Sequence, residues 1–272
     1  MDLPRAIERC FDCPDPGRKV ALVHALYRDW SERRLDTDAL TGGEPRPVTA
    51  PGRPPRPRLV SPRELPRRRL GSIEGRAALL HAVAHIEFNA IHLALDAAYR
   101  FRGLPGEYYA DWLRVADDEA RHFSMVVERL AGLGFGYGDF PAHNGLWEMA
   151  EETAHDVMVR MALVPRVLEA RGLDVTPGMM ERLRSAGDEP SAEVLARILR
   201  EEIPHVAIGS RWYRHFCGLR GLPPESTFRG LLQAYMRGRL KGPFNVDARM
   251  AAGFSAAELK ALAALTPDSA GQ

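Results

Sequence analysis

Apolar residues recur every three or four positions along most of the chain, the spacing that gathers them on one face of an α-helix. This pattern predicts a short helix at residues 18–34 and four long helices at 72–101, 105–131, 146–171 and 191–217. We find no run that alternates apolar with polar residues and is rich in β-branched side chains, as a strand would be. The sequence therefore predicts an all-α protein.

The connections between these helices predict how they are arranged. The loop near residues 103–105 is so short that the first two long helices must form an antiparallel hairpin. The next connection, 132–144, contains four glycines and a proline, and it can return along a bundle because it spans ~40 Å when extended at ~3.3 Å per residue. Two hairpins with a long crossover are typical of the ferritin-like four-helix bundle. We predict this bundle at 71–218, after an N-terminal helix and arm at 1–70 and before a C-terminal helical extension at 219–272.

The arm, residues 44–70, has a composition unlike the rest of the chain. It contains eight of the 21 prolines, and its eight arginines and two glutamates give it a charge of +6 in a chain of charge +1. So many prolines exclude a helix or a central strand and predict an extended, polyproline-like segment. We interpret the arm as a strap packed on the body. Nucleic-acid binding is the alternative, although no aromatic residues interleave for base stacking.

Composition and charge place the chain among soluble proteins, with 45% hydrophobic and 27% charged residues. The longest stretch without Asp, Glu, Lys or Arg is ten residues, 77–86, whereas a membrane-spanning helix needs ~20 apolar residues. The N-terminus lacks the layout of a secretory signal. Cys10 and Cys13 have no second cysteine pair to complete a zinc site, so we expect reduced thiols. These features predict a cytoplasmic protein that does not contact membranes.

The strongest chemical signal is the motif Glu-x-x-His, which occurs at Glu119/His122, Glu152/His155 and Glu202/His205. Residues i and i+3 of a helix share one face, so each pair can direct a carboxylate and an imidazole to one point. A four-helix bundle builds a two-metal site from one such pair on each of two helices and one Glu on each of the other two. Mixed imidazole and carboxylate donors favour iron or manganese over magnesium or calcium.

The two single glutamates follow from the spacing. Glu87 lies about as far before the turn of the first hairpin as Glu119 lies after it, so the two should face each other at nearly equal height. For the third helix, Glu169 and Glu152 are the candidates. The sequence separation of Glu169 from Glu202 nearly equals that of Glu87 from Glu119, but Glu169 also lies near the predicted end of its helix. The spacing favours Glu169, and Glu152 stays as the alternative.

Two prolines lie close to these candidates. Pro165 is one turn before Glu169, and Pro204 lies inside the last motif. Each removes a helical hydrogen bond and predicts a local distortion of the kind that often marks a functional site. His155 is a candidate to contact the metal ligands without binding the metal itself. The histidines of the first long helix are interpreted as packing or surface residues: His81, His85 and His92.

Four stretches of the predicted helices, 85–96, 111–123, 164–174 and 201–212, resemble the bacterial ferritin-like proteins known as domain-of-unknown-function family 455. The second of them reads DWLRVADDEARHF. That family looks like a distant relative of the tRNA-modifying di-iron hydroxylase that acts on an isopentenylated adenosine. The resemblance implies two iron ions held by Glu87, Glu119, His122, Glu169, Glu202 and His205. Pro204 departs from the motif of that hydroxylase.

Together these features predict a ferritin-like dinuclear metal protein. The leading hypothesis is a di-iron, O2-dependent hydroxylase or oxidase with two Fe ions, Mn or a mixed Fe/Mn pair being the alternative. Its substrate would be an unidentified small molecule or modified nucleoside, and its electrons would come from a reductase partner. A ferroxidase that handles iron and a structural bundle without metal are the competing classes. We expect the arm and the C-terminal extension to cover the substrate entrance, with Arg249 or Asn245 reaching the pocket.

Overall fold

The computed structural model describes residues 2–37, 40, 44–66, 68–236 and 240–266. Within these ranges the protein is built of helices without a strand, and the extended pairings are two isolated bridges, Asp2 with Asp36 and Leu59 with Ala142. The predicted all-α class is confirmed. The chain forms two compact units, the first made of residues 1–151 and 182–194 and the second of 152–181 and 195–272. The division expected from the sequence, at residues 70 and 218, stays a prediction.

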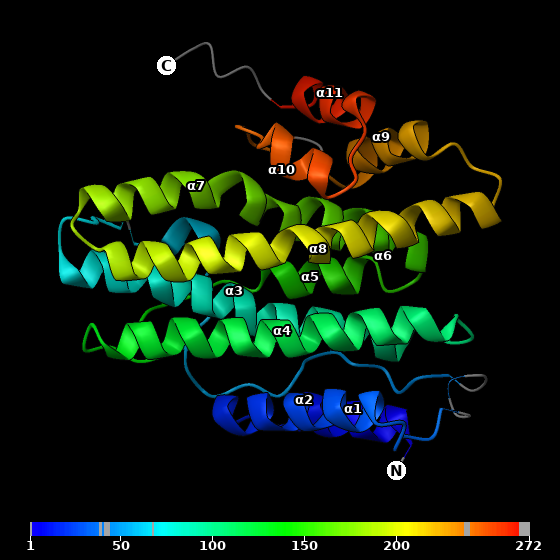
Figure 1. Ribbon diagram of the computed structural model, residues 1–272, viewed down its shortest axis with the longest axis horizontal. Coiled ribbons are helices and arrows are strands. Elements are labelled where there is room, and N and C mark those ends of the chain that lie inside the picture. Colours follow the sequence, from blue (N-terminus) through cyan, green and yellow to red (C-terminus); the bar gives the residue numbers. More distant parts are fainter. Residues whose placement is uncertain (1, 38–39, 41–43, 67, 237–239, 267–272) are drawn as a thin grey trace. The chain divides into compact units, whose positions relative to one another are not determined.

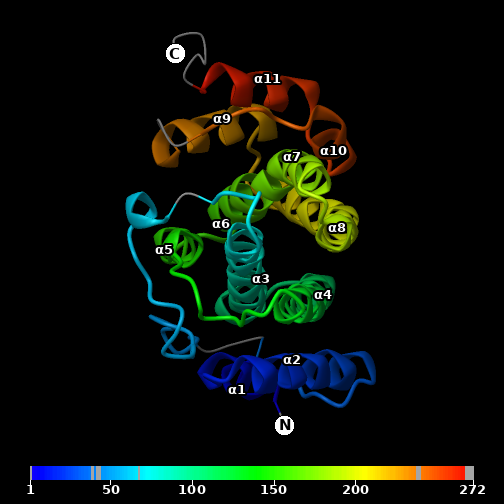
Figure 2. The same cartoon turned by 90° about the vertical axis from the view of Figure 1, so that its left-hand side faces the viewer.

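The first unit is organised around the hairpin of α3 (Ile73–Arg100) and α4 (Gly106–Ala131), which lie side by side (Figures 1 and 2). The Ser72 side chain caps α3 by accepting a hydrogen bond from the backbone N–H of Gly75. In the turn after α3, Gly103 has a φ of 68°, a conformation that glycine adopts at little cost. The predicted helices at 72–101 and 105–131 and their antiparallel hairpin are therefore confirmed.

The apolar character of α3 reflects its place in the core. Among the described helices, α3 is long and apolar enough to cross a membrane by length and composition, but 89% of its most apolar window is buried inside the protein. Nearly every residue of α3 from Ala77 to Tyr99 is buried. The apolar stretch of α3 is therefore that of a mostly buried core helix.

Two helices, α1 (Leu3–Asp12) and α2 (Pro16–Ser31), complete one side of the first unit, where α2 packs on α4. The predicted helix at 18–34 corresponds to α2, whereas α1 was not predicted from the sequence pattern. Asp2 caps α1 by accepting a hydrogen bond from the backbone N–H of Arg5. The buried Nζ of Lys19 donates to the carbonyl oxygens of Cys10 and Phe11, at 2.6 and 3.1 Å, and so satisfies the end of α1.

The arm lies along one side of the first unit and is held there mainly by backbone groups (Figure 2). The N–H of Gly52 donates to the carbonyl of Phe11 at 2.6 Å, and the N–H of Val60 donates to that of Ala142 at 2.8 Å. The carbonyl of Thr49 accepts from the indole N–H of Trp147, on α5 (Gly145–Glu152), at 3.2 Å. A Cβ at residue 52 would lie 2.6 Å from the carbonyl oxygen of Asp12, so only glycine fits this close approach.

The long helix predicted at 146–171 is wrong in two respects. The chain breaks after α5, resumes as α6 (Val157–Leu163), passes through the π-helical turn Val164–Glu169, and continues as α7 (Ala170–Ser185). The break occurs because the Asp156 side chain accepts hydrogen bonds from the N–H groups of Met158 and Val159 and starts a new helix. The expected stop at Gly172 fails because an isolated glycine costs a helix only about 1 kcal/mol.

The remaining helices belong wholly or mostly to the second unit. α8 (Glu189–Leu219) confirms the helix predicted at 191–217 and continues through Pro204. It is followed by α9 (Pro224–Tyr235), α10 (Val246–Ala251) and α11 (Ala256–Ala264). The segment after α8 is thus helical, as predicted. Within this unit α9 packs on both α6 and α11.

Two buried arginines join the C-terminal helices to the rest of the second unit. Arg166, in the π-helical turn, forms an ion pair with Glu258 of α11 at 2.7 Å. Arg249 of α10 donates to both carboxylate oxygens of Asp174, at 2.8 and 2.7 Å. Asn245 caps α10 and donates to the carbonyl of Leu173. Arg249 and Asn245 thus tie α10 to α7, and the expectation that they reach a substrate pocket is not supported.

Candidate metal centre

Three of the expected ligands come together in the first unit, across the α3–α4 hairpin. The Nδ1 atom of His122 lies 3.3 Å from Oε2 of Glu87 and 3.5 Å from Oε2 of Glu119. One donor atom from each of the three residues can be chosen so that all lie within 4.8 Å of one another. Glu87 is 5% exposed, Glu119 is 1% exposed and His122 is 0% exposed. The predicted facing of Glu87 and Glu119 across the hairpin is therefore confirmed.

The hairpin explains this convergence. Glu87 precedes the turn at Leu104 by nearly the same number of residues as Glu119 follows it, so their heights along the helices differ by only about 3 Å. Because Glu119 and His122 stand at positions i and i+3 of α4, they share one face. Ala84 of α3 and Ala116 of α4, one turn away on the same faces, are fully buried. The three donors thus lie in the buried core of the first unit.

A bound cation would offset much of the cost of burying these groups. Two ionised carboxylates repel each other, and each loses hydration when it leaves water. One imidazolium can offset at most one of the two negative charges, whereas a divalent cation offsets both. Two carboxylate oxygens and an imidazole nitrogen are the donors that iron and manganese accept. The Glu87, Glu119 and His122 cluster could therefore hold a metal ion.

The second unit contains the other Glu-x-x-His pair on a helix, Glu202 and His205 of α8. The Nδ1 atom of His205 lies 3.5 Å from Oε1 of Glu202, the same separation as in the Glu119/His122 pair. His205 is 2% exposed. Although Pro204 lies between the two residues, α8 is continuous here, so the carboxylate and the imidazole still share one face of the helix.

Glu169 is the last residue of the π-helical turn Val164–Glu169. The distortion predicted at Pro165 is confirmed, because this proline lies in that turn. The objection that Glu169 lies near a helix end is removed, because α7 continues the helical segment to Ser185. π-Helical turns occur frequently at functional sites. Whether Glu169 is a metal ligand stays a prediction.

The third Glu-x-x-His motif has a different position. Glu152 is the last residue of α5, and His155 follows in the turn, so the two do not share a helical face. Both side chains are exposed. The Nδ1 atom of His155 lies 3.1 Å from the carbonyl oxygen of Glu152, and its Nε2 atom lies 3.5 Å from the Tyr235 hydroxyl. The expectation that all three motifs lie on helices is wrong for this one.

The histidines of α3 bind the crossover between α4 and α5. His85 Nδ1 lies 2.9 Å from the Tyr137 hydroxyl, and His81 Nε2 accepts a hydrogen bond from the N–H of Gly138 at 2.9 Å. Burial lowers the pKa of both His81 and His85 to about 4, so both rings are neutral near pH 7. Their interpretation as packing residues is confirmed, and His92 is fully buried as well.

Two charged clusters were missed by the sequence analysis. Asp188, 4% exposed, pairs with Arg76 of α3 at 3.2 Å and with Arg129 of α4 at 2.7 Å. Arg166 pairs with Glu258, and its guanidinium carbon lies 4.2 Å from the centre of the Phe228 ring. Each cluster joins segments far apart in the sequence, and no local spacing signals such a pairing.

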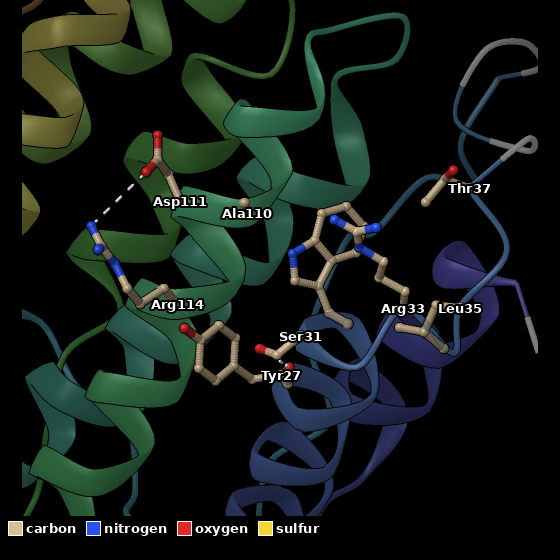
Figure 3. A pocket seen from close by; sticks show the side chains of 9 residues that line it. Tyr27, Ser31, Arg33, Leu35, Thr37, Ala110, Asp111 and Arg114 are labelled. Atoms are coloured by element: carbon tan, nitrogen blue, oxygen red, sulfur yellow. Dashed lines mark hydrogen bonds and ion pairs between the residues drawn. The ribbon is translucent and has the colours of Figure 1, made fainter.

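An open groove of about 580 Å³ in the first unit lies between α2 and α4 (Figure 3). Tyr27 and Arg33 come from the α2 side, and Ala110 and Arg114 come from α4. Arg33 has a φ of 55°, which is uncommon for a residue with a side chain. None of the metal-ligand candidates lines this groove, so it is separate from the carboxylate cluster.

The fold and the site define an all-α protein with a buried Glu/His cluster that could bind a metal ion. Comparison of the sequence with known families places residues 12–260 in the family described as "Protein of unknown function (DUF455)", and the chain belongs to this family. A relative from Haemophilus influenzae, described as an uncharacterized protein, is 46% identical over 265 residues, which cover 93% of this chain and 91% of the relative. No solved structure matches the chain.

Proposed function

We propose that the protein is a di-iron oxidoreductase, an O2-dependent hydroxylase or oxidase built on a ferritin-like bundle. The observation that carries the proposal is the buried convergence of Glu87, Glu119 and His122, whose donor atoms can lie within 4.8 Å of one another. A bound cation would offset the cost of burying two carboxylates, and the donors of the cluster suit iron. The same donors accept manganese, so a manganese or mixed pair is the alternative metal content.

We propose further that Glu169, Glu202 and His205 supply the other half of the same centre. Two arguments support this assignment: the number of ligands that a two-metal site needs, and the positions of these residues relative to the turn between α7 and α8. A two-metal carboxylate site in a bundle draws ligands from four helices, and α3 and α4 supply only half of that set. Glu169 precedes the turn between α7 and α8, at Gly187, by a sequence distance similar to that by which Glu202 follows it. Their heights therefore agree within about 5 Å, as those of Glu87 and Glu119 do.

The iron pair would supply the activation of O2. A hydroxylation balances as RH + O2 + 2 electrons + 2 protons giving ROH + H2O, with the electrons taken from a reductase partner. The chain's carboxylates would offset the metal charge, and His122 and His205 would bind through unprotonated nitrogens. Apolar neighbours such as Ala84 and Ala116 would exclude bulk water from the reacting groups.

The proposed substrate is a small organic molecule or a modified nucleoside. We keep the cytoplasm as the proposed location, because the cysteines of the described chain, Cys10, Cys13 and Cys217, are buried free thiols rather than disulfides. A reductase in the same compartment would then supply the electrons. Substrate identity would follow from metabolite or nucleoside extracts incubated with the reduced, iron-loaded protein.

Oxygen consumption separates this function from iron storage. Oxygen-free protein is given an excess of ferrous iron and then exposed to O2, with and without a reductase system. An oxidoreductase should oxidise about two ferrous ions per chain and stop, and it should resume only when the reductase returns the electrons. Continued oxidation of the excess iron, with ferric iron retained by the protein, would instead establish a ferroxidase. No oxidation above the rate of iron in buffer would contradict both.

A further inference from the structure

Five exposed arginines of the arm form what we call the arginine strip: Arg53, Arg56, Arg58, Arg63 and Arg69. Within the described residues, the structure gives their guanidinium groups no hydrogen bond and no ion pair. The arm's other residues include Glu64, whose carboxylate accepts a hydrogen bond from the backbone N–H of Ser61 and is engaged in a capping box. Among the described residues, the strip therefore carries five positive charges without a direct ion pair to a carboxylate.

The strip is not needed to hold the arm in place. The arm is attached by backbone hydrogen bonds, such as those of Gly52 and Val60. Where an arginine does serve as an anchor, its contacts are explicit: Arg46 donates to a carboxylate oxygen of Asp12 at 2.9 Å, and its backbone N–H donates to the Tyr99 hydroxyl at 3.0 Å. The five arginines of the strip make no such contacts and are left to face solvent.

The five charges are distributed along the arm between Arg53 and Arg69. The arm bends at Pro55 and Pro57, and Arg63 lies in the short 3-10 helix Pro62–Glu64. Cations distributed along a segment of chain can contact successive phosphates of a polyanion. An open hollow of about 480 Å³ is lined by Arg58, Ser61 and Asn144 together with the carboxylates of Glu64 and Glu148.

The composition of the strip argues against a protein or membrane partner. Protein interfaces centre on buried aromatic or large apolar anchors, and membrane-binding segments insert such residues. The large hydrophobic residues that are exposed in the described chain all lie outside the arm: Ile73, Ile86, Leu219, Leu222, Val246 and Met250. Guanidinium groups bind phosphate oxygens in a two-point geometry. The absence of aromatic residues between the arginines also removes base stacking as a source of sequence preference.

We propose that the arginine strip binds the phosphodiester backbone of nucleic acid without reading its sequence. The inference rests on the arm alone and does not depend on the metal site. For the single-stranded oligomers used in the test, five phosphate contacts give a salt dependence with a slope of about −3.5 in log K against log salt. Affinity should accordingly fall about 100-fold between roughly 50 and 200 mM salt.

The test is fluorescence anisotropy of the full chain with a labelled oligouridine, and in parallel with an oligothymidine of the same length. The triple variant Arg53→Gln/Arg56→Gln/Arg58→Gln removes three charges and should reduce the magnitude of the salt slope by about 2, with a matching loss of affinity at low salt. The control variant Arg28→Gln/Arg33→Gln/Arg114→Gln removes three arginines of the same unit outside the arm and should bind within a factor of about two of wild type.

Equal binding of the uridine and thymidine oligomers supports recognition of the shared phosphate backbone, because the two differ at the 2′-hydroxyl. Binding of the RNA oligomer alone would overturn backbone recognition. Equal losses in both triple variants would also overturn the proposal, because net charge would then explain the effect. Displacement of the labelled oligonucleotide by polyglutamate at a lower charge concentration than unlabelled oligouridine requires would instead assign the strip to an acidic protein. Unchanged thermal unfolding of the variants ensures that each result reports binding.

Discussion

A methyl group at Gly209 of α8 would lie 2.4 Å from Cβ and Cγ of Pro165 in the π-helical turn. The missing side chain at Gly209 therefore lets α8 approach this turn, whose last residue is Glu169. Real Cβ atoms do not approach so closely, and a proline ring offers little room for adjustment. The close approach of these two residues fixes where the π-helical turn lies within the second unit.

Gly209→Ala should lower the free energy of unfolding by about 1–3 kcal/mol, because the added methyl group overpacks this contact. The matched control is Gly218→Ala on the same helix, where a Cβ would meet no atom within 4 Å. That control should be neutral or stabilising by up to about 1 kcal/mol through helix propensity. Urea denaturation measures both variants. Equal effects of the two substitutions would show that the close approach does not constrain the protein.

The Arg166 guanidinium in the same turn is surrounded by Tyr213, Phe228 and Phe254, with ring centres 4.2–4.7 Å away, and pairs with Glu258. Burial lowers the pKa of Arg166, and the charge of Glu258 opposes that shift. Glu258→Ala should cost about 3–5 kcal/mol, because it leaves the buried cation without its carboxylate.

The double variant Arg166→Met/Glu258→Leu should recover most of that loss, because it removes both buried charges. Glu193→Ala, at an exposed position, is the control and should change stability by less than about 0.5 kcal/mol. Chemical denaturation of all three proteins gives the comparison. A double variant less stable than Glu258→Ala would contradict the view that the unpaired cation causes the loss.

The buried ion pairs of Asp188 should make the stability of the protein depend on pH. Burial would raise the pKa of Asp188, but hydrogen bonds from Arg129 and Ser191 outweigh it and hold that pKa below its usual value of 3.8. The stabilisation is therefore fully present above pH 3.8 and is lost as the pH falls through the lower pKa of the folded state. Asp188→Asn should cost about 3 kcal/mol near neutral pH, and its difference from wild type should shrink in acid.

The neighbouring Glu189 gives a matched control, because its ion pair with Arg184, at 3.0 Å, is on the surface. Glu189→Gln should cost at most about 1 kcal/mol at any pH. Thermal unfolding from acid to neutral pH measures both variants against wild type. A loss for Asp188→Asn that did not diminish in acid would show that the carboxylate charge is not what stabilises the cluster.

The parts of the fold that depend on local sequence could be predicted. The α3–α4 hairpin follows from helical periodicity, the Ser72 cap and the short turn at Gly103, all within neighbouring residues. The break before α6 was missed because α5 ends at Glu152 and Asp156 caps the next helix, with neither a proline nor a glycine between them. α1 was missed because its ten residues are few for a periodic pattern, although Leu3, Ile7 and Phe11 have helical spacing.

The part of the candidate site that depends on spacing along the sequence could also be predicted. Glu87, Glu119 and His122 could be assigned because two quantities can be counted along the sequence. These are the i, i+3 spacing within α4 and the distance of each glutamate from the hairpin turn. The exposure of Glu152 and His155 could not be foreseen, because it depends on the break that follows α5. Ion pairs within a unit, such as that of Asp188 with Arg129, could not be predicted. These two residues are 59 positions apart, and only the folded chain brings them together.

The most direct test of the metal-centre account is the metal content of the purified protein, measured by plasma mass spectrometry after purification without a metal-affinity column. Wild type should contain about two iron or manganese ions per chain, and Glu119→Gln should lose them. Glu152→Gln, in the exposed copy of the same motif, should retain the wild-type content. A wild-type protein that stays free of metal after reloading with ferrous iron, or equal losses in both variants, would contradict the account.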